Sequence, residues 1–161
     1  MFTGDRRLTT EPFTFRRATR NDLEAIIALL ADDDLGQSRE CVSTPVDQAY
    51  LSAFAAIQSD SNQLLAILED DTGVAGCLQI SFIPGLSRLG MWRGQIESVR
   101  IARRCRGDGL GRTMIEWAIE QCRLKQCGLV QLTSDKARKD ALRFYASLGF
   151  TASHEGLKLA L

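Results

Sequence analysis

Apolar and polar residues follow two different periods along this chain, and each period predicts a different kind of element. A spacing of three to four residues predicts helices from Thr19 to about Leu30, from near Pro45 to Ile57, from Leu110 to about Gln126 and around 138–147. Alternating or continuously apolar runs predict strands at 13–15, 64–68, 74–80, 96–102 and 129–132, with a final pair at 150–154 and 157–160. The order β-α-α-β-β-β-α-β-α-β-β is typical of a mixed α+β fold with one sheet and helices on both faces.

Local signals support several of these elements. Thr19 is a good helix cap, and acidic residues follow it in the first turn. The polar stretch Asp70–Gly73 separates two apolar runs and predicts a short turn in an antiparallel hairpin. Pro84-Gly85 ends the second of these strands. We expect residues 1–12 to be a polar tail and residues 13–161 to be one domain without repeats or linkers.

Composition excludes several classes of protein. The 161 residues are 45% hydrophobic and 25% charged, which is ordinary for a globular domain with a substantial core. Lys plus Arg equals Asp plus Glu at 20 each, so no overall charge favours nucleic acid or an anionic membrane as a partner. The first twenty residues lack the apolar core of a signal peptide, and no apolar run is long enough to span a bilayer, so we expect a cytoplasmic protein. Five scattered cysteines and a single histidine favour reduced thiols and no metal site.

The richest chemistry lies between the strand at 96–102 and the helix that opens at Leu110. The stretch Arg106-Gly107-Asp108-Gly109-Leu110-Gly111 leaves backbone N–H groups uncovered at the positive end of a helix dipole, which is a site for phosphate groups. Along the sequence only Asp108 opposes a group of neighbouring arginines, which predicts a strongly cationic loop: Arg100, Arg103, Arg104, Arg106 and Arg112.

The spacing of the glycines decides between kinds of phosphate loop. A Walker P-loop requires a glycine at the position of Arg106 and a lysine at that of Arg112. The dinucleotide fingerprint fails because its last glycine falls on Arg112. The pattern Arg-x-x-Gly-x-Gly instead resembles the acyl-CoA diphosphate loop of the GNAT superfamily of N-acetyltransferases. The stretch from Ala141 to Phe150, with Tyr145 four residues after Ala141 and then Leu-Gly-Phe, is similar to the late helix of that superfamily.

The resemblance covers nearly the whole chain, from about residue 13 to residue 161, and it includes small bacterial members. It implies the GNAT fold, a mostly antiparallel central sheet whose middle strands splay apart, and acetyl-CoA as co-substrate. It also implies that backbone of the strand before the loop hydrogen-bonds the acetyl carbonyl, an interaction of the oxyanion type worth up to ~3 kcal/mol per donor. The residues that would contact CoA are Val99, Arg100, Ile101, Arg106, Gly107, Asp108, Gly109, Leu110, Gly111, Arg112, Arg138, Ala141 and Phe144.

Two residues are candidates for the catalytic proton transfers. Tyr145 matches the acidic tyrosine of the family and would protonate the departing thiolate. Glu97 would be the general base; in an unbroken, mostly buried strand it shares a face with Val99 and Ile101, and burial would raise its pKa. An ion pair with a nearby arginine is an equally good role for Glu97, and a bulge in the strand would change which residues share its face. His154, the only histidine, is either a turn residue or a second candidate base or amine-binding group.

One position departs from the family pattern. Many relatives carry an asparagine seven residues before the tyrosine, where this chain has Arg138, which either reaches a CoA phosphate or begins the helix as a solvated residue. The acceptor is expected to be an amine of a small molecule or peptide. Acids near the expected cleft mouth would suit a cationic one: Asp32 to Asp34, Glu40 and Asp47.

Three further alternatives stay open. The protein is either an enzyme or a module that senses acyl-CoA without turnover, the acyl group is acetyl or larger, and the family resemblance makes a homodimer possible. In the family the helix at 45–57 overhangs the substrate cleft, so Tyr50 and Phe54 would line it, although with Ile57 they also form one apolar face suited to the core.

Overall fold

A computed structural model describes residues 13–32 and 36–161. The expected tail over 1–12, and Asp33 and Asp34 of the acidic turn, lie outside these described residues.

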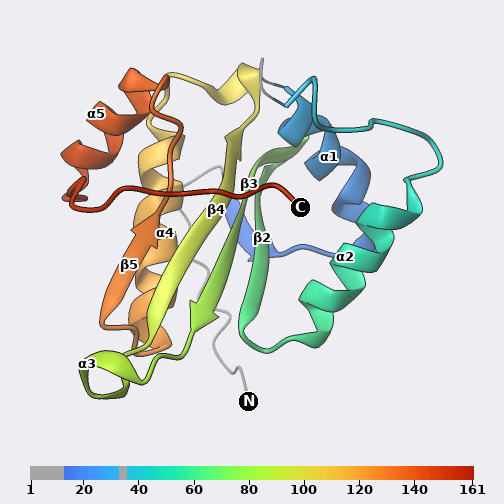
Figure 1. The fold of residues 1–161 in the computed structure, drawn as a ribbon. Coiled ribbons are helices and arrows are strands. Elements are labelled where there is room, and N and C mark those ends of the chain that lie inside the picture. The colour runs from blue at the N-terminus through green and yellow to red at the C-terminus, as the bar shows by residue number, and fades with distance from the viewer. Residues whose placement is uncertain (1–12, 33–35) are drawn as a thin grey trace.

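The described residues form a five-stranded sheet in the order β1-β2-β3-β4-β5 (Figure 1). The strands are β1 (Thr14–Arg17), β2 (Gln63–Asp70), β3 (Gly73–Ile83), β4 (Arg93–Ile101) and β5 (Leu129–Leu132). The first four pair antiparallel and β5 runs parallel to β4, which confirms the mostly antiparallel sheet. The predicted hairpin is present, with β2 and β3 joined by a tight turn, and both strands extend beyond the predicted ends.

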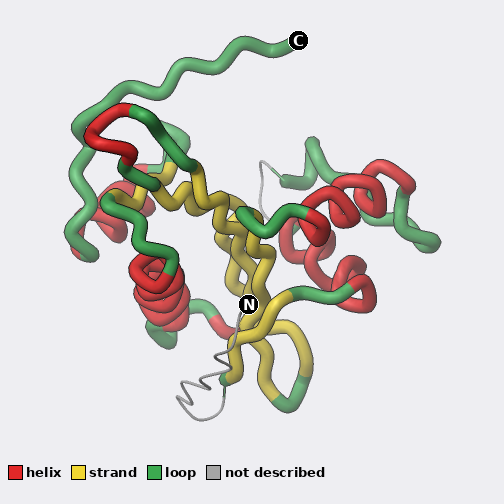
Figure 2. The backbone as a smooth tube through the Cα atoms, turned by 90° about the horizontal axis from the view of Figure 1, so that it is seen from below, coloured by secondary structure: helices red, strands yellow, loops and turns green. Residues whose placement is uncertain are grey.

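Helices cover both faces of the sheet (Figure 2). The four predicted helices are present: α1 (Leu23–Ala31), α2 (Gln48–Ser59), α4 (Leu110–Leu124) and α5 (Lys139–Ser147). A short helix, α3 (Ser87–Gly90), was not predicted. Two 3-10 turns complete the set, one before α1 at Arg20–Asp22 and one after β4 at Arg103–Cys105. One buried cluster lies between the sheet and α4, and a second lies between the sheet and the pair α1 and α2. No helix of the described part is both long enough and apolar enough to cross a bilayer.

The final strand pair predicted at 150–154 and 157–160 is wrong. Residues 150–161 contain no strand, and the segment runs in front of the sheet in Figure 1 and well clear of it in Figure 2. Leu157, Leu159 and Leu161 alternate as they would in a strand, but each is at least 87% exposed. Alternation predicts a strand only where a neighbouring strand takes up its hydrogen bonds, and this segment pairs with none.

An ionic network ties β1 to the start of α1. Arg16 donates to both oxygens of Asp22, at 2.7 and 2.8 Å, and to both oxygens of Glu69, at 3.0 and 2.8 Å. The Asp22 carboxylate also accepts hydrogen bonds from the backbone N–H and the hydroxyl of Thr19, so the predicted cap is present. These donors, the Arg16 guanidinium foremost, lower the pKa of Asp22 from 3.8 to about 2.

Replacing Asp22 by Asn will destabilise the fold in a pH-dependent way. The pKa of Asp22 is lower in the folded state, so its contribution is present above the unfolded pKa near 4 and is lost as the pH falls toward 2. Urea unfolding should show a loss of about 2 kcal/mol at pH 7, and the difference from the unsubstituted protein should shrink by pH 3. Asp140→Asn removes an exposed pair with Arg143 and is the control, with an expected loss below about 0.5 kcal/mol. An equal loss for D22N at pH 7 and pH 3 would contradict the role of its charge.

Candidate active site

The glycine loop has the backbone geometry that its sequence requires. Gly107 and Gly109 have φ angles of +99° and +79°, in the region that favours glycine, and Gly109 caps α4. A Cβ built at either residue meets nothing within 4 Å, so the backbone of the loop is open. The N–H groups of Arg112 and Thr113 donate to the carbonyl of Gly109, at 2.9 and 3.2 Å, whereas those of Leu110 and Gly111 come too early in α4 to reach a carbonyl of the helix. The loop therefore presents bare amides at the positive end of a helix.

The arginines near the loop have acidic partners, so the prediction of a field opposed only by Asp108 is wrong. Arg103 and Arg106 both pair with Asp32, at 2.7 and 3.0 Å, and Arg104 pairs with Asp70. The fold brings these two carboxylates from far away in sequence, since Asp32 directly follows α1 and Asp70 ends β2. Arg106 also donates to the carbonyl of Ile101, so this residue clamps the loop between β4 and the end of α1.

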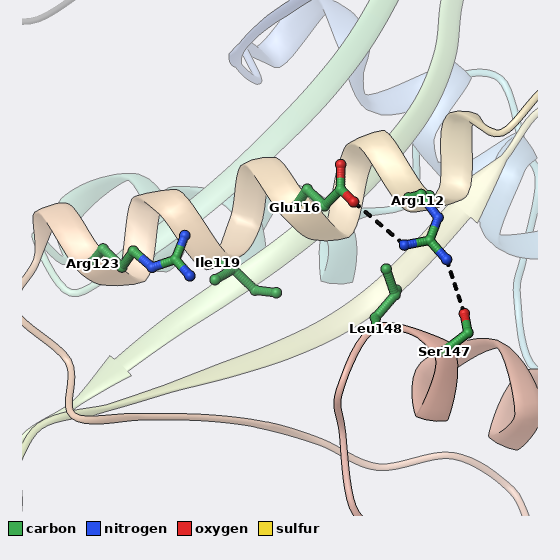
Figure 3. Close-up of a pocket in the computed structure, with 6 residues that line it drawn as sticks. All are labelled: Arg112, Glu116, Ile119, Arg123, Ser147 and Leu148. Atoms are coloured by element: carbon green, nitrogen blue, oxygen red, sulfur yellow. Dashed lines mark hydrogen bonds and ion pairs between the residues drawn. The ribbon is translucent and has the colours of Figure 1, made fainter.

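Helix α5 packs beside the first turns of α4. The ring of Phe144 packs over Gly111, since a Cβ built at Gly111 would lie 3.5 Å from it, in ordinary van der Waals contact. Arg112 joins the helices by donating to the Ser147 hydroxyl at 3.0 Å, and it pairs with Glu116 at 3.5 Å (Figure 3). These residues line a cavity of about 260 Å³ together with Ile119, Arg123 and Leu148.

Tyr145 is partly buried in an aromatic group on α5. Its ring contacts those of Phe144 and Phe150 edge-on, with centroids 5.2 and 5.9 Å away. Burial raises the pKa of Tyr145 above its ordinary value of 10.0, and the positive charges of Arg138 and Arg100 oppose this shift. The phenol therefore keeps its proton at neutral pH, as a general acid must. Ala141 lies one turn earlier on the same helix.

Strands β4 and β5 splay apart as expected. Their pairing runs only from Arg93 with Leu129 to Ile96 with Leu132, so in the described residues β4 from Glu97 to Ile101 has no partner on the β5 side. The backbone of Val99, Arg100 and Ile101 lies in this unpaired half, directly before the glycine loop.

A bulge in the same half of β4 changes which side chains share a face. Cys77 of β3 pairs with Arg100 and Gln79 pairs with Glu97, so two residues of β4, Ser98 and Val99, oppose one residue of β3. Ser98 has a φ of +55°.

The expectation that Glu97 shares a face with Val99 and Ile101 is therefore wrong. Val99 and Ile101 pack in the cluster on the α4 side. Arg100 is on the opposite side, the side of Glu97, because it pairs with Cys77, which belongs to the cluster under α1 and α2.

Glu97 is exposed, so the expectation of a buried carboxylate is also wrong. Within residues 13–32 and 36–161, Glu97 makes no ion pair with an arginine, which removes the purely structural alternative for it. Its carboxylate is therefore a solvent-facing group at the splay between β4 and β5.

The remaining candidates lie away from the glycine loop in sequence, and each has a structural setting of its own. His154 is exposed on the C-terminal segment, and its Nδ1 lies 2.8 Å from the Ser153 hydroxyl, as the turn interpretation expects. Arg138 is exposed and precedes α5. Tyr50 donates to Glu40 at 2.7 Å, and Phe54 is 5% exposed; both pack in the cluster under α1 and α2.

The acids proposed for a cationic acceptor have other partners in the protein. Asp32 binds two arginines, Glu40 accepts from Tyr50, and Asp47 caps α2 through the N–H of Ala49. In the described part of the chain no group of three or more metal-binding side chains is placed to hold an ion.

Sequence reasoning missed a row of amide side chains on the sheet face that carries Glu97. Gln63, Ser81, Gln95 and Gln131 are paired across β2 to β5. The signal is present in the sequence as alternate polar positions in otherwise apolar strands, but only the register shows that they meet.

Comparisons with known proteins agree with this geometry. The model of the Acetyltransferase (GNAT) family matches residues 23–150. The aminoalkylphosphonate N-acetyltransferase of Salmonella typhimurium is 28% identical over 140 residues, covering 86% of this chain and 85% of that protein.

Solved structures share the fold of this chain. A Bacillus halodurans protein described as a transcriptional regulator is 46% identical, with a TM-score of 0.90 over 92% of this chain and 99% of that one. A predicted acetyltransferase from Clostridium acetobutylicum, solved with acetyl-CoA, shares the fold with a TM-score of 0.71 at 17% identity, over 92% of this chain and 96% of that one. The family model spans most of the chain, and its named relative is an N-acetyltransferase. This protein therefore belongs to the Acetyltransferase (GNAT) family.

Proposed function

We propose that this N-acetyltransferase moves an acetyl group from acetyl-CoA to a primary amine by direct attack within a ternary complex. The observation that carries the proposal is the open glycine loop at the start of α4, placed directly after the unpaired half of β4. Bare helix amides suit a diphosphate, and unpaired strand backbone suits an extended arm bearing amide groups.

The glycine loop and the unpaired half of β4 suit CoA because both leave backbone groups uncovered. Gly107 and Gly109 have empty space where side chains would stand, so a diphosphate can approach the amides of Gly109 to Gly111. The backbone of Val99 to Ile101 would hold the pantetheine arm and the acetyl carbonyl. The guanidinium groups of Arg103, Arg104 and Arg106 are paired with carboxylates and serve to hold the loop in place.

The proposed reaction balances with two proton transfers. The amine nitrogen forms a bond to the thioester carbonyl carbon, and the bond from that carbon to sulfur breaks. Glu97 takes the proton that the amine loses, directly or through water, because it is exposed on the unpaired half of β4. Tyr145 gives its proton to the departing sulfur, and the products are an amide and free CoA.

The named relative supports an amine as the acceptor. The Salmonella typhimurium protein is an aminoalkylphosphonate N-acetyltransferase, and its alignment covers most of both chains. By analogy we propose a small amine that carries an anionic group.

A second candidate follows from the Bacillus halodurans relative. Since a protein with 46% identity is described as a transcriptional regulator, a regulatory role that uses bound acyl-CoA without turnover is the competing proposal.

A thiol-release assay with acetyl-CoA and 2-aminoethylphosphonate, followed by a wider amine panel, separates the two. The enzyme proposal expects turnover with initial-rate plots that intersect, as a ternary complex requires. Tight CoA binding without turnover on any amine would favour the regulator. Repeating the assay with propionyl-CoA tests whether a larger acyl group is preferred.

Replacing Gly109 by Trp will abolish CoA binding, because a side chain there blocks the amides that hold the diphosphate. We expect the dissociation constant from calorimetric titration to rise by at least about 100-fold, which is near 3 kcal/mol. Gly73→Trp is the matched control: Gly73 also has a positive φ, of +117°, and open space, but it lies in the β2–β3 turn. Retained affinity in G109W, or equal loss in G73W, would mean that the diphosphate binds elsewhere.

Removing the Tyr145 hydroxyl will slow turnover and spare CoA binding. For Tyr145→Phe we expect kcat to fall about 100-fold, the usual contribution of a general acid, with the CoA dissociation constant unchanged within about twofold. Tyr50→Phe, which removes a hydroxyl bonded to Glu40, is the control and should keep full turnover. An unchanged kcat for Y145F would remove the acid role.

Neutralising Glu97 will lower the rate at neutral pH more than it changes either substrate's binding. We expect Glu97→Gln to lose about 10- to 100-fold in kcat, with the loss reduced at alkaline pH, where more of the free amine is already neutral. Glu120→Gln on α4, whose partner is Arg123, is the matched control. A rate equal to that of the unsubstituted protein at pH 7 would assign the proton transfer to another group.

A further inference from the structure

The face of the sheet opposite α4 is polar where α1 and α2 leave it uncovered. A Cβ at Gly94 would point at Cys122 of α4, so the neighbouring residues Arg93 and Gln95 face the other way. In both views α1 and α2 cover the β1 and β2 side of that face, and no helix lies in front of β4 and β5 (Figures 1 and 2).

Five polar side chains, which we call the amide platform, lie together on this face. Four stand in one row across the sheet, since Gln63 pairs with Ser81, Ser81 with Gln95, and Gln95 with Gln131. Gln79 is the fifth; it lies two residues from Ser81 on β3 and opposite Glu97. All five are half-buried.

Hydrogen bonds within the amide platform hold its side chains in place. The Gln63 side-chain oxygen accepts from the amide of Gln79 at 3.0 Å and from the hydroxyl of Ser81 at 2.9 Å. The Gln131 amide donates to the side-chain oxygen of Gln95 at 2.7 Å. Each glutamine amide offers two donors and two acceptor sites, so these bonds leave donors on Gln63 and Gln95 and acceptors on Gln79 and Gln131 for a ligand. The platform is a rigid surface for hydrogen bonding.

Charged residues lie at the two ends of the amide platform along β4. Glu97 lies two residues beyond Gln95 toward the splay, and Arg93 lies two residues before it, so each is about 7 Å from Gln95 along the strand. The Nε of Arg93 is buried and, among the described residues, has no hydrogen-bond partner. In the part of the chain that the structure describes, no carboxylate forms an ion pair with Arg93, so the rest of its guanidinium is suited to an anionic group that a ligand brings.

We propose that the amide platform is the acceptor site, and that the acceptor is a primary amine on a hydroxylated or amide-bearing body with an anionic group at its far end. This inference rests on the proposed function, in which Glu97 receives the proton of the amine. The amine lies at Glu97, the body lies over Gln95 and Gln131, and the anion pairs with Arg93. A hydrocarbon amine binds weakly because it would leave the half-buried amides without partners.

Three probe amines separate these contributions. Glucosamine 6-phosphate has a hydroxylated body and an anion, glucosamine lacks the anion, and cyclohexylamine lacks both. The platform predicts that kcat/KM falls in that order, by about tenfold or more at each step. Cyclohexylamine as the best of the three acceptors would overturn the inference.

Two variants test the named residues. In Gln95→Leu the KM for glucosamine 6-phosphate should rise about tenfold or more while the KM for acetyl-CoA stays within about twofold. In Arg93→Gln the preference for glucosamine 6-phosphate over glucosamine should disappear. Gln121→Leu is the control, because Gln121 is a half-buried glutamine on α4, on the other side of the sheet, and its kinetics should equal those of the unsubstituted protein. Acceptor KM values unchanged by Q95L and R93Q would refute the site.

A binding measurement keeps this inference apart from the proposed function. Glucosamine 6-phosphate is titrated calorimetrically into the CoA-loaded protein and into the CoA-loaded Q95L and R93Q variants, with circular dichroism to show that each variant is folded. Binding that the variants weaken supports the platform even where no amine is acetylated, an outcome that would refute only the enzyme. Turnover with unweakened binding in both variants would refute the platform and leave the enzyme standing.

Discussion

One extra residue in β4 determines how the side chains near the splay are arranged. Because Ser98 and Val99 together oppose Leu78, the alternation of β4 reverses between Glu97 and Arg100. Val99 and Ile101 thus pack toward α4, while Glu97 and Arg100 turn to the face that carries the amide side chains. In the same half of the strand the described residues supply no partner on the β5 side. The carboxylate that we propose as the base, the unpaired backbone edge of β4 and a polar surface consequently meet at one place.

The glycine loop depends on contacts that hold it from two sides. On one side Arg106 joins the carbonyl of Ile101 to Asp32 at the end of α1. On the other, Phe144 of α5 packs over Gly111 in the first turn of α4. Because the guanidinium groups of Arg103 and Arg106 both pair with Asp32, we propose that the backbone amides of the loop, which the helix holds in a fixed orientation, bind the diphosphate.

The sequence predicted elements well wherever local pattern decides them. The hairpin, the strand at Leu129–Leu132, the helix after the glycine loop and the α+β order follow from periodicity, caps and glycines. The final strand pair was wrong because alternation among Leu157, Leu159 and Leu161 states nothing about a pairing partner. The prediction of a strongly cationic glycine loop was wrong because the fold brings Asp32 and Asp70, which are distant in sequence, against the arginines near the loop.

The sequence predicted which residues form the candidate site better than it predicted how their side chains are arranged. Tyr145 and the glycine loop carry motifs, and the structure gives both a geometry that suits the expected chemistry. The face of Glu97 depended on a bulge at Ser98 that residue types do not specify. The row from Gln63 to Gln131 joins four strands, so it is visible only once their register is known.

We propose that the amides at the start of α4 bind the diphosphate of a CoA thioester whose arm runs along the unpaired half of β4. A crystal structure of the protein with CoA tests it most directly. We expect diphosphate oxygens within about 3 Å of the N–H groups of Gly109 to Gly111, and pantetheine amides hydrogen-bonded to the backbone of Val99 to Ile101. A diphosphate held elsewhere, with these amides facing only solvent, would contradict it.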